Sequence, residues 1–185
     1  MVNLWEGKLV RLRAVEPDDW KIFHEWDKDG MGGRFTDEVW FPGSTVVQQK
    51  WAEDEATRKP DNDEYRFQIE SLAGELVGTL NTHSCNPRNG TFYYGIAILP
   101  PHRRKGYAAD AIKLLLRYYF QERRYQKVTI KVYSFNEASM RLHESLGFQV
   151  EGRLRRMVYT DGGFHDEVVY GMTVEEFREK HLANM

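Results

Sequence analysis

A short basic loop between a predicted strand and a predicted helix constrains this sequence more than any other feature. Residues Arg103 to Ala108 read Arg-Arg-Lys-Gly-Tyr-Ala; the apolar run Tyr93–Leu99 precedes them and the amphipathic run Tyr107–Phe120 follows. A helix that begins after such a loop leaves several backbone N–H groups unpaired, and its dipole favours negative charge there. With cationic side chains beside it, the loop predicts a phosphate-binding site.

The spacing within the loop excludes two common phosphate-binding motifs. A Walker A loop needs Gly-Lys followed by Ser or Thr, and the dinucleotide fingerprint needs three glycines in G-x-G-x-x-G. Here Lys105 precedes Gly106 and Tyr107 follows it, which gives the pattern R-x-x-G-x-A. A basic turn alone is more often a solvated connection, so a second motif is needed to support a binding role.

That second motif follows further along the chain. Asn136-Glu137-Ala138-Ser139 opens a helical pattern, which runs through Leu142 and Leu146 and closes at Gly147-Phe148. Asn136 suits the N-cap of this helix and Gly147 suits its C-cap.

Together, these two motifs resemble those of the GCN5-related N-acetyltransferases (GNAT), which bind acetyl-coenzyme A. The opening Leu9–Asp19, the segment Asn136–Phe148 and the ending Asp161–Asp166 are similar to the RimJ/RimL-type and spermidine acetyltransferase branch. The resemblance extends from Lys8 to about Met172 and is weakest over residues 28–64. It implies an α/β (α+β) fold with a mixed, mostly antiparallel sheet of about seven strands, flanked by helices and splayed at the coenzyme A site.

Local patterns predict the elements of such a fold. Alternation of polar and apolar residues predicts strands, and 3.6-residue periodicity predicts helices. Residues 28–43 hold three glycines and a Pro-Gly pair and are expected to be a loop. Strands are expected at 8–13, 65–70, 76–80, 91–99, 127–133, 152–159 and 164–172, and helices after Glu16 and at 44–57, 107–120, 136–146 and 174–181.

The composition is that of one globular domain spanning residues 1–185. Lys and Arg total 26 against 28 for Asp and Glu, so the net charge of −2 argues against nucleic acid as a partner. Cys85 is the lone cysteine, which excludes an intramolecular disulfide or a multi-cysteine zinc site. We expect no metal, no export signal, no membrane span and a cytoplasmic location. Edge strands of the last hairpin could pair two copies in a homodimer.

The resemblance implies an acyltransferase in which an acceptor amine attacks the thioester of acetyl-coenzyme A directly. The backbone of the strand before the loop would meet the pantetheine arm and the thioester oxygen, the loop would bind the pyrophosphate, and the Asn136 helix would meet the coenzyme A arm. The residues expected to bind this cosubstrate are Ile96, Ala97, Ile98, Arg103, Arg104, Lys105, Gly106, Tyr107, Ala108, Asn136, Ser139 and His143.

Catalytic roles are less strongly marked. A backbone donor near Ile98 could stabilise the developing oxyanion. His143 stands where many family members carry a tyrosine that protonates the departing thiolate; it could supply that proton, pack in the core or bind coenzyme A. Glu70 and His83 are candidates for a general base, although a water chain could serve instead. Glu38, His165 and Asp166 are further candidates.

The acceptor is expected to be a primary amine. At pH 7 an α-amine is roughly 10% neutral, whereas a lysine-like amine is only about 0.04% neutral, so a site without a strong base favours a peptide N-terminal α-amine. A polyamine or other small amine is the alternative, since the acidic run Glu53–Glu64 could attract a cation, although such runs are usually just solvated. A coenzyme A-binding regulatory domain without turnover is the other alternative.

Overall fold

The computed structural model describes residues 3–36 and 38–182. Seven strands form one sheet in the order β1-β2-β3-β4-β5-β7-β6. Contacts divide the chain into two compact units, the first within residues 1–82 and 95–114 and the second within 83–94 and 115–185, and each is described by itself. β3 (Leu76–Asn86), β4 (Thr91–Ile98) and α4 (Tyr107–Gln121) run from one unit into the other.

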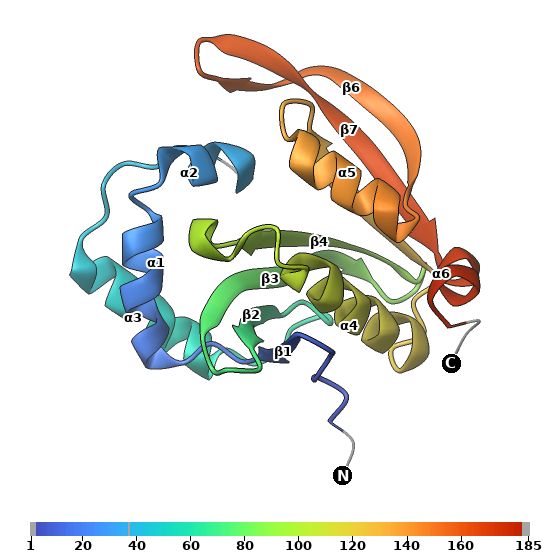
Figure 1. Ribbon diagram of the computed structural model, residues 1–185, viewed down its shortest axis with the longest axis horizontal. Helices are drawn as coiled ribbons and strands as arrows, with labels where there is room; N and C mark the ends of the chain where they lie inside the picture. The colour runs from blue at the N-terminus through green and yellow to red at the C-terminus, as the bar shows by residue number, and fades with distance from the viewer. Residues whose placement is uncertain (1–2, 37, 183–185) are drawn as a thin grey trace. The chain divides into compact units, whose positions relative to one another are not determined.

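The first unit holds an antiparallel three-stranded segment and the amino-terminal helices. β1 pairs with β2 and β2 with β3, so that Leu12 lies opposite Ile69 and Phe67 opposite Leu80 on one apolar, buried face. Helices α1 and α3 pack side by side (Figure 1), with the ring centroids of Phe23 and Trp51 4.9 Å apart. Besides its part of β3, β4 and α4, this unit holds β1 (Val10–Arg13), η1 (Pro17–Asp19), α1 (Trp20–Trp26), α2 (Gly30–Thr36), α3 (Thr45–Thr57) and β2 (Arg66–Ser71).

The prediction of a loop over residues 28–43 was wrong in part, because α2 (Gly30–Thr36) is a helix. Glycines in sequence favour a loop, but Gly32 is buried in this helix and permits close packing. A Cβ at Gly32 would lie 2.9 Å from the indole nitrogen of Trp26 and 2.8 Å from the Asp29 carboxylate. Thr36 then donates a hydrogen bond from its hydroxyl back to the Gly32 carbonyl.

The second unit is built on the carboxy-terminal strands. β4 pairs in parallel with β5 over Thr91–Tyr93, whereas β5 with β7 and β7 with β6 are antiparallel. The long β6–β7 hairpin, with α5 beside it in Figure 1, closes through Asp161 and Gly162, whose positive φ angles of 53° and 76° give a two-residue turn. Besides its part of β3, β4 and α4, the second unit holds β5 (Lys127–Tyr133), α5 (Glu137–Leu146), β6 (Gln149–Thr160), β7 (Gly163–Thr173) and α6 (Val174–His181).

The expected architecture is therefore confirmed: a mixed, mostly antiparallel sheet of seven strands flanked by helices. The expected helix at 44–57 is α3, capped at its start by Ser44, and the expected strand at 127–133 is β5. None of the helices within residues 3–36 and 38–182 is both long and apolar enough to cross a membrane. The single-domain organisation and the splay of the sheet stay predictions.

Candidate functional site

The basic loop has the backbone geometry that an anion site needs. Arg104 and Gly106 both adopt left-handed conformations, with φ of 62° and 83°, and α4 begins at the next residue, Tyr107. The first helical hydrogen bond runs from Asp110 N to Gly106 O at 3.1 Å, so the N–H groups of the preceding turn have no partner within the helix. The exposed Arg104 and Lys105 add positive charge, and this donor set fits a pyrophosphate.

Asp110 fixes the position of this helix start. Its carboxylate accepts hydrogen bonds from the backbone N–H groups of Leu9, at 2.7 Å, and Val10, at 3.1 Å. The carboxylate also occupies the space that a side chain at Gly7 would need. The amino-terminal segment is thereby tied to the first turn of α4, a link between residues a hundred positions apart that no local pattern predicts.

Arg103 faces the strand before the loop. Its Nε donates to the carbonyl oxygen of Ile98 at 3.0 Å, and its guanidinium lies 3.8 Å from the Asp29 carboxylate. Two of the expected site residues, Arg103 and Ile98, are thus brought together directly. The side chain expected to meet phosphate charge instead braces the end of β4 in this structure.

Peptide groups of β4 alternate in direction over the segment expected to meet the thioester. Leu99 N donates to Val77 O at 2.9 Å, and the Ala97 carbonyl points at Gly78, where a side chain would collide with it. Because neighbouring residues of a regular strand direct their backbone groups to opposite edges, the N–H and C=O groups of Ile96 and Ile98 are expected on the edge away from β3, where the Ile98 carbonyl already accepts from Arg103.

In the second unit, α5 brings Asn136, Ser139 and His143 together. The Asn136 side-chain oxygen accepts from Ser139 N at 3.2 Å, and Gly147 ends the helix with φ of 97°, so both predicted caps are confirmed. One turn on, His143 Nδ1 lies 2.8 Å from the Ser139 carbonyl oxygen, and Nε2 lies 2.8 Å from the hydroxyl of Tyr94.

The partners of His143 identify the tautomer of its neutral form. A backbone carbonyl can only accept, so Nδ1 carries a proton, and in the neutral imidazole Nε2 accepts the hydrogen bond that Tyr94 donates. Burial, with His143 only 2% exposed, lowers its pKa from 6.5 to about 4 despite the bond to Ser139, and burial raises the pKa of Tyr94. The imidazole is therefore neutral at pH 7.

Glu70, in the first unit, lies in a network of charged side chains. Arg13 Nε donates to one Glu70 oxygen at 2.6 Å and Arg11 donates to the other, while Arg13 also binds Asp19 at 2.8 Å. Burial raises the pKa of Glu70, but the hydrogen bonds and charges of Arg13 and Arg11 outweigh it, so the pKa is lowered. The carboxylate is a weak base.

The remaining base candidates have surroundings of other kinds. His83 is exposed, with Nδ1 3.3 Å from the Ser84 hydroxyl and its ring stacked on Tyr93. Asp166 accepts from Arg153 Nε at 2.7 Å, which lowers its pKa. His165 packs edge-on against Phe135, and Glu38 is exposed.

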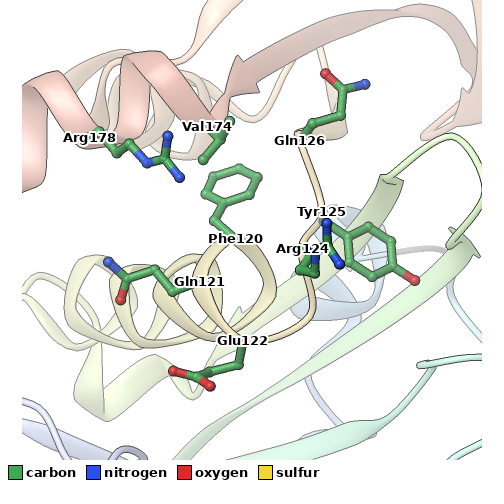
Figure 2. Close-up of a pocket in the computed structure, with 8 residues that line it drawn as sticks. All are labelled: Phe120, Gln121, Glu122, Arg124, Tyr125, Gln126, Val174 and Arg178. Carbon is green, nitrogen blue, oxygen red and sulfur yellow. The ribbon is translucent and has the colours of Figure 1, made fainter.

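A hollow of about 580 Å³ lies in the second unit, at the end of α4 and beside α6 (Figure 2). Buried Phe120 and Val174 line it together with the cationic Arg124 and Arg178. No predicted site residue lines it. Elsewhere, the described residues contain no group of three or more His, Cys, Asp or Glu side chains placed to hold a metal ion.

Sequence reasoning missed three residues that shape these groups: Tyr94, Asp110 and Arg13. A Ser139–His143 contact could have been found, because residues four apart share a helix face. The partners of His143 and Glu70 on other elements could not, because they lie 49 and 57 to 59 residues away in sequence.

Comparisons with known proteins agree with this architecture. The family model described as "Acetyltransferase (GNAT) domain" matches residues 10–149. The SPbeta prophage-derived uncharacterized N-acetyltransferase YokL of Bacillus subtilis (strain 168) is 41% identical over 97% of this chain and 98% of its own. The spermidine N(1)-acetyltransferase of Vibrio cholerae is 27% identical over 85% of this chain and 88% of its own.

Among solved structures, the spermidine N-acetyltransferase from Vibrio cholerae, in complex with CoA and spermine, superposes with a TM-score of 0.78. That match covers 91% of this chain and 97% of the other at 22% identity, so it establishes a shared fold.

Proposed function

The chain belongs to the GNAT acetyltransferase family, and we propose that it transfers the acetyl group of acetyl-coenzyme A directly to a primary amine. The observation that carries the proposal is the left-handed loop at Arg104–Gly106, which exposes the N-terminal N–H groups of α4 beside cationic side chains. Directly before it, the alternation of a β-strand would turn the backbone groups of Ile96 and Ile98 to the edge away from β3.

For cosubstrate binding, we assign the pyrophosphate to the backbone of Arg104, Gly106, Tyr107 and Ala108, with charge from Lys105. Ile96, Ala97 and Ile98 offer backbone groups to the pantetheine arm and thioester, and Asn136 and Ser139 meet the coenzyme A arm. The Asn136 oxygen already caps α5, so its amide nitrogen is the atom proposed for this contact. Arg103 acts by bracing Ile98, in addition to its charge.

For the leaving group, we propose that coenzyme A departs without a proton from His143. A neutral imidazole lacks the acidic second proton of an imidazolium, and its one remaining hydrogen, on Nδ1, is held by the Ser139 carbonyl, so it is a poor acid at pH 7. A thiol with a pKa of about 8.5 leaves readily as the thiolate, which water then protonates. His143 thus serves packing rather than acid catalysis.

For the acceptor, we propose that the amine loses its proton to water rather than to Glu70. Glu70 is held as a carboxylate by two arginines, and a lowered pKa makes it a poor base. Of Glu70 and His83, the two candidates for the general base, this leaves His83. With Glu70 a poor base, an acceptor that is partly neutral at pH 7 is favoured, and a peptide α-amine meets that condition better than a polyamine.

A polyamine is the second candidate, supported by the similarity to the spermidine acetyltransferase of Vibrio cholerae. Against it, Glu55 within the acidic run is paired with Arg58 at 2.9 Å and Arg66 at 3.5 Å, so its charge is already compensated.

The test is thiol release from acetyl-coenzyme A by the purified protein, with α-amine peptides, free amino acids, spermidine and aminoglycosides offered in parallel. We expect the highest kcat/KM with an α-amine peptide. A higher kcat/KM with spermidine would select the second candidate. Tight acetyl-coenzyme A binding without turnover on any amine would instead support a regulatory domain.

We further propose a homodimer in the cytoplasm. β6 ends the strand order of the sheet, and its hairpin exposes Val150, Met157, Tyr159 and Phe164, so a second copy could pair along it. Sedimentation velocity should then give a dimer that Met157→Glu dissociates. A monomer at all concentrations would contradict the dimer.

The proposed cytoplasmic location is supported by the lone Cys85, because a chain without a disulfide fits a reducing compartment.

A further inference from the structure

The strands β1 to β3 of the first unit have two faces of opposite character. One face is apolar, as expected for a covered sheet. The other carries polar and charged side chains that are nevertheless buried: Gln68 is 0% exposed and Glu70 and Thr79 are each 8% exposed. Burying polar groups is costly unless they are hydrogen-bonded, so such a face calls for an explanation. Paired positions on it are Arg11 with Glu70, Arg13 with Gln68, Gln68 with Thr79, and Arg66 with Asn81.

Most groups on this polar face have partners. Glu70 binds Arg11 and Arg13, and the hydroxyl of Thr79 donates to the Phe67 carbonyl at 3.1 Å. Gln68 is the exception: within the described residues, neither its side-chain oxygen nor its nitrogen has a hydrogen-bond partner. A wholly buried amide in this state indicates that a polar guest, such as water, completes the face.

Asn81 lies diagonally beside Gln68, since Thr79 is opposite Gln68 and Asn81 is opposite Arg66. Its side chain reaches over β4 at Gly95. A Cβ at Gly95 would stand 3.0 Å from the Asn81 side-chain oxygen and, among the described residues other than the chain neighbours Tyr94 and Ile96, would have no further residue within 4 Å. The missing side chain therefore leaves the Asn81 amide open to the backbone directly before Ile96.

We propose that Asn81 receives the acceptor amine, an inference that rests on the proposed acetyl transfer. Its side-chain oxygen accepts an N–H hydrogen bond and so orients the amine lone pair toward the thioester carbonyl held at Ile96–Ile98. The new bond joins the amine nitrogen to the acetyl carbon, the carbon–sulfur bond breaks with its electron pair on sulfur, and the surplus amine proton passes to water. Gln68, the diagonal neighbour of Asn81 on the polar face, binds that water.

The charge of the polar face defines the class of amine. Arg11, Arg13 and Arg66 carry three positive charges, and Asp19, Glu55 and Glu70 carry three negative charges. Each of these carboxylates is paired with one of these arginines, and Glu55 also with Arg58, so none of the three is an uncompensated negative charge that would attract a polycation. An amide acceptor beside it binds one neutral amine, as an α-amine supplies.

The experiment measures kcat and KM for the best acceptor, together with the acetyl-coenzyme A Kd, in Asn81→Ala, Asn81→Asp and the control Asn89→Ala. The hydrogen bonds of Asn89 to Asn86 and Gln126 use its backbone atoms, so its truncation should leave all three constants unchanged. Asn81→Ala should lower kcat/KM for the acceptor at least about tenfold and leave the acetyl-coenzyme A Kd within about twofold.

Asn81→Asp gives a readout that a structural role would not move. A carboxylate at this position stabilises a protonated amine, so the pH profile of kcat/KM should shift to higher pH and the KM for spermidine should fall.

Gly95→Ala tests the same contact with Asn81 in place. The new Cβ would crowd the Asn81 side chain at 3.0 Å, and Gly95 has no positive φ, so the backbone tolerates alanine. This variant should reduce kcat/KM in the same direction as Asn81→Ala, and the double variant should be no worse than Asn81→Ala alone.

Two results separate the possible failures. Turnover by the unmodified protein with unchanged kcat/KM in both Asn81→Ala and Gly95→Ala would overturn the role of Asn81 and leave acetyl transfer standing. No turnover by the unmodified protein with any amine would overturn the proposed function itself, and the inference with it.

Discussion

Two buried polar clusters, one in each unit, differ in charge: the first consists of ion pairs and the second is neutral. In the first unit the Arg13 guanidinium is held to the side chains of Asp19 and Glu70 by hydrogen bonds of 2.6 to 2.9 Å, and the pKa of Glu70 is lowered. In the second unit Tyr94 and His143 stay neutral at pH 7. Burial raises the pKa of Tyr94 and lowers the pKa of His143, so it disfavours the charged form of each. One cluster is stabilised by pairing charges, the other by having none.

The difference shows how an ionisable side chain must be judged by its partners. Glu70 and His143 were both candidates for moving protons. The first is a carboxylate that arginines keep deprotonated, and the second is an imidazole that burial keeps deprotonated. Both clusters fix structure, which leaves the proposed chemistry to backbone groups, an amide and water.

The largest expected effect comes from removing the cation that both carboxylates share. Arg13→Met keeps the apolar stem but removes the guanidinium that both Asp19 and Glu70 contact. Removing one partner of a buried ion pair costs about 3–5 kcal/mol, so the free energy of unfolding should fall by that amount. Urea unfolding at pH 7 measures it.

A matched control is Lys21→Met. Lys21 pairs with Asp18 at 2.8 Å, but both side chains are well exposed, at 61% and 87%. Such a pair contributes about 0–1 kcal/mol. Equal losses in the two variants would mean that burial does not distinguish the Arg13 cluster from a surface pair.

The second effect is a loss of stability in mild acid that comes from His143. Its folded pKa of about 4 lies below the usual 6.5, so the unfolded chain binds the proton first and stability falls as the pH drops below 6.5. Between pH 6.5 and 5 the loss should be about 1.6 kcal/mol, since the slope rises from about half of 1.36 kcal/mol per pH unit at pH 6.5 toward the full value below it. His143→Gln, which retains a donor and an acceptor, should lose less stability than the unmodified protein over this interval. Urea unfolding of both proteins at both pH values measures this. An equal loss of unfolding free energy in the two proteins would contradict the assignment.

Much of the fold could be predicted from the sequence because its signals are local. Asn136 and Gly147 carry cap chemistry in their own side chain and backbone, and the turn at Asp161–Gly162 needs residues that accept positive φ. The helix at Gly30–Thr36 could not be predicted, because local glycine propensity points to a loop while Gly32 packs tightly against Trp26.

The basic loop of the candidate site was also predictable from local signals, but the state of its ionisable residues was not. Arg104 and Gly106 supply left-handed positions from their own backbone, whereas the behaviour of Glu70 depends on β1 and that of His143 on β4. Side-chain pairing across a sheet follows from tertiary packing, which periodicity does not encode.

A smaller effect is expected from Tyr94→Phe, which removes the hydroxyl that donates to His143 Nε2. A buried acceptor then lacks its partner, at a cost of about 1–2 kcal/mol in the free energy of unfolding. Tyr159→Phe is the control, since Tyr159 is 65% exposed and should be neutral. No difference between these two variants would show that the Tyr94–His143 bond does not stabilise the second cluster.

The smallest effect should be on turnover in His143→Gln. Glutamine can donate to the Ser139 carbonyl and accept from Tyr94, as histidine does, but it cannot deliver a proton. If His143 only packs, kcat with the best acceptor should stay within about twofold of the unmodified protein. Loss of a general acid would instead lower kcat about 10²-fold or more, and the fall would be steepest with a substrate whose leaving thiol is most basic. Turnover measured with acetyl-coenzyme A and with an acetyl thioester of a more basic thiol decides between them. A kcat that falls more for the second substrate in His143→Gln than in the unmodified protein would assign the proton to His143.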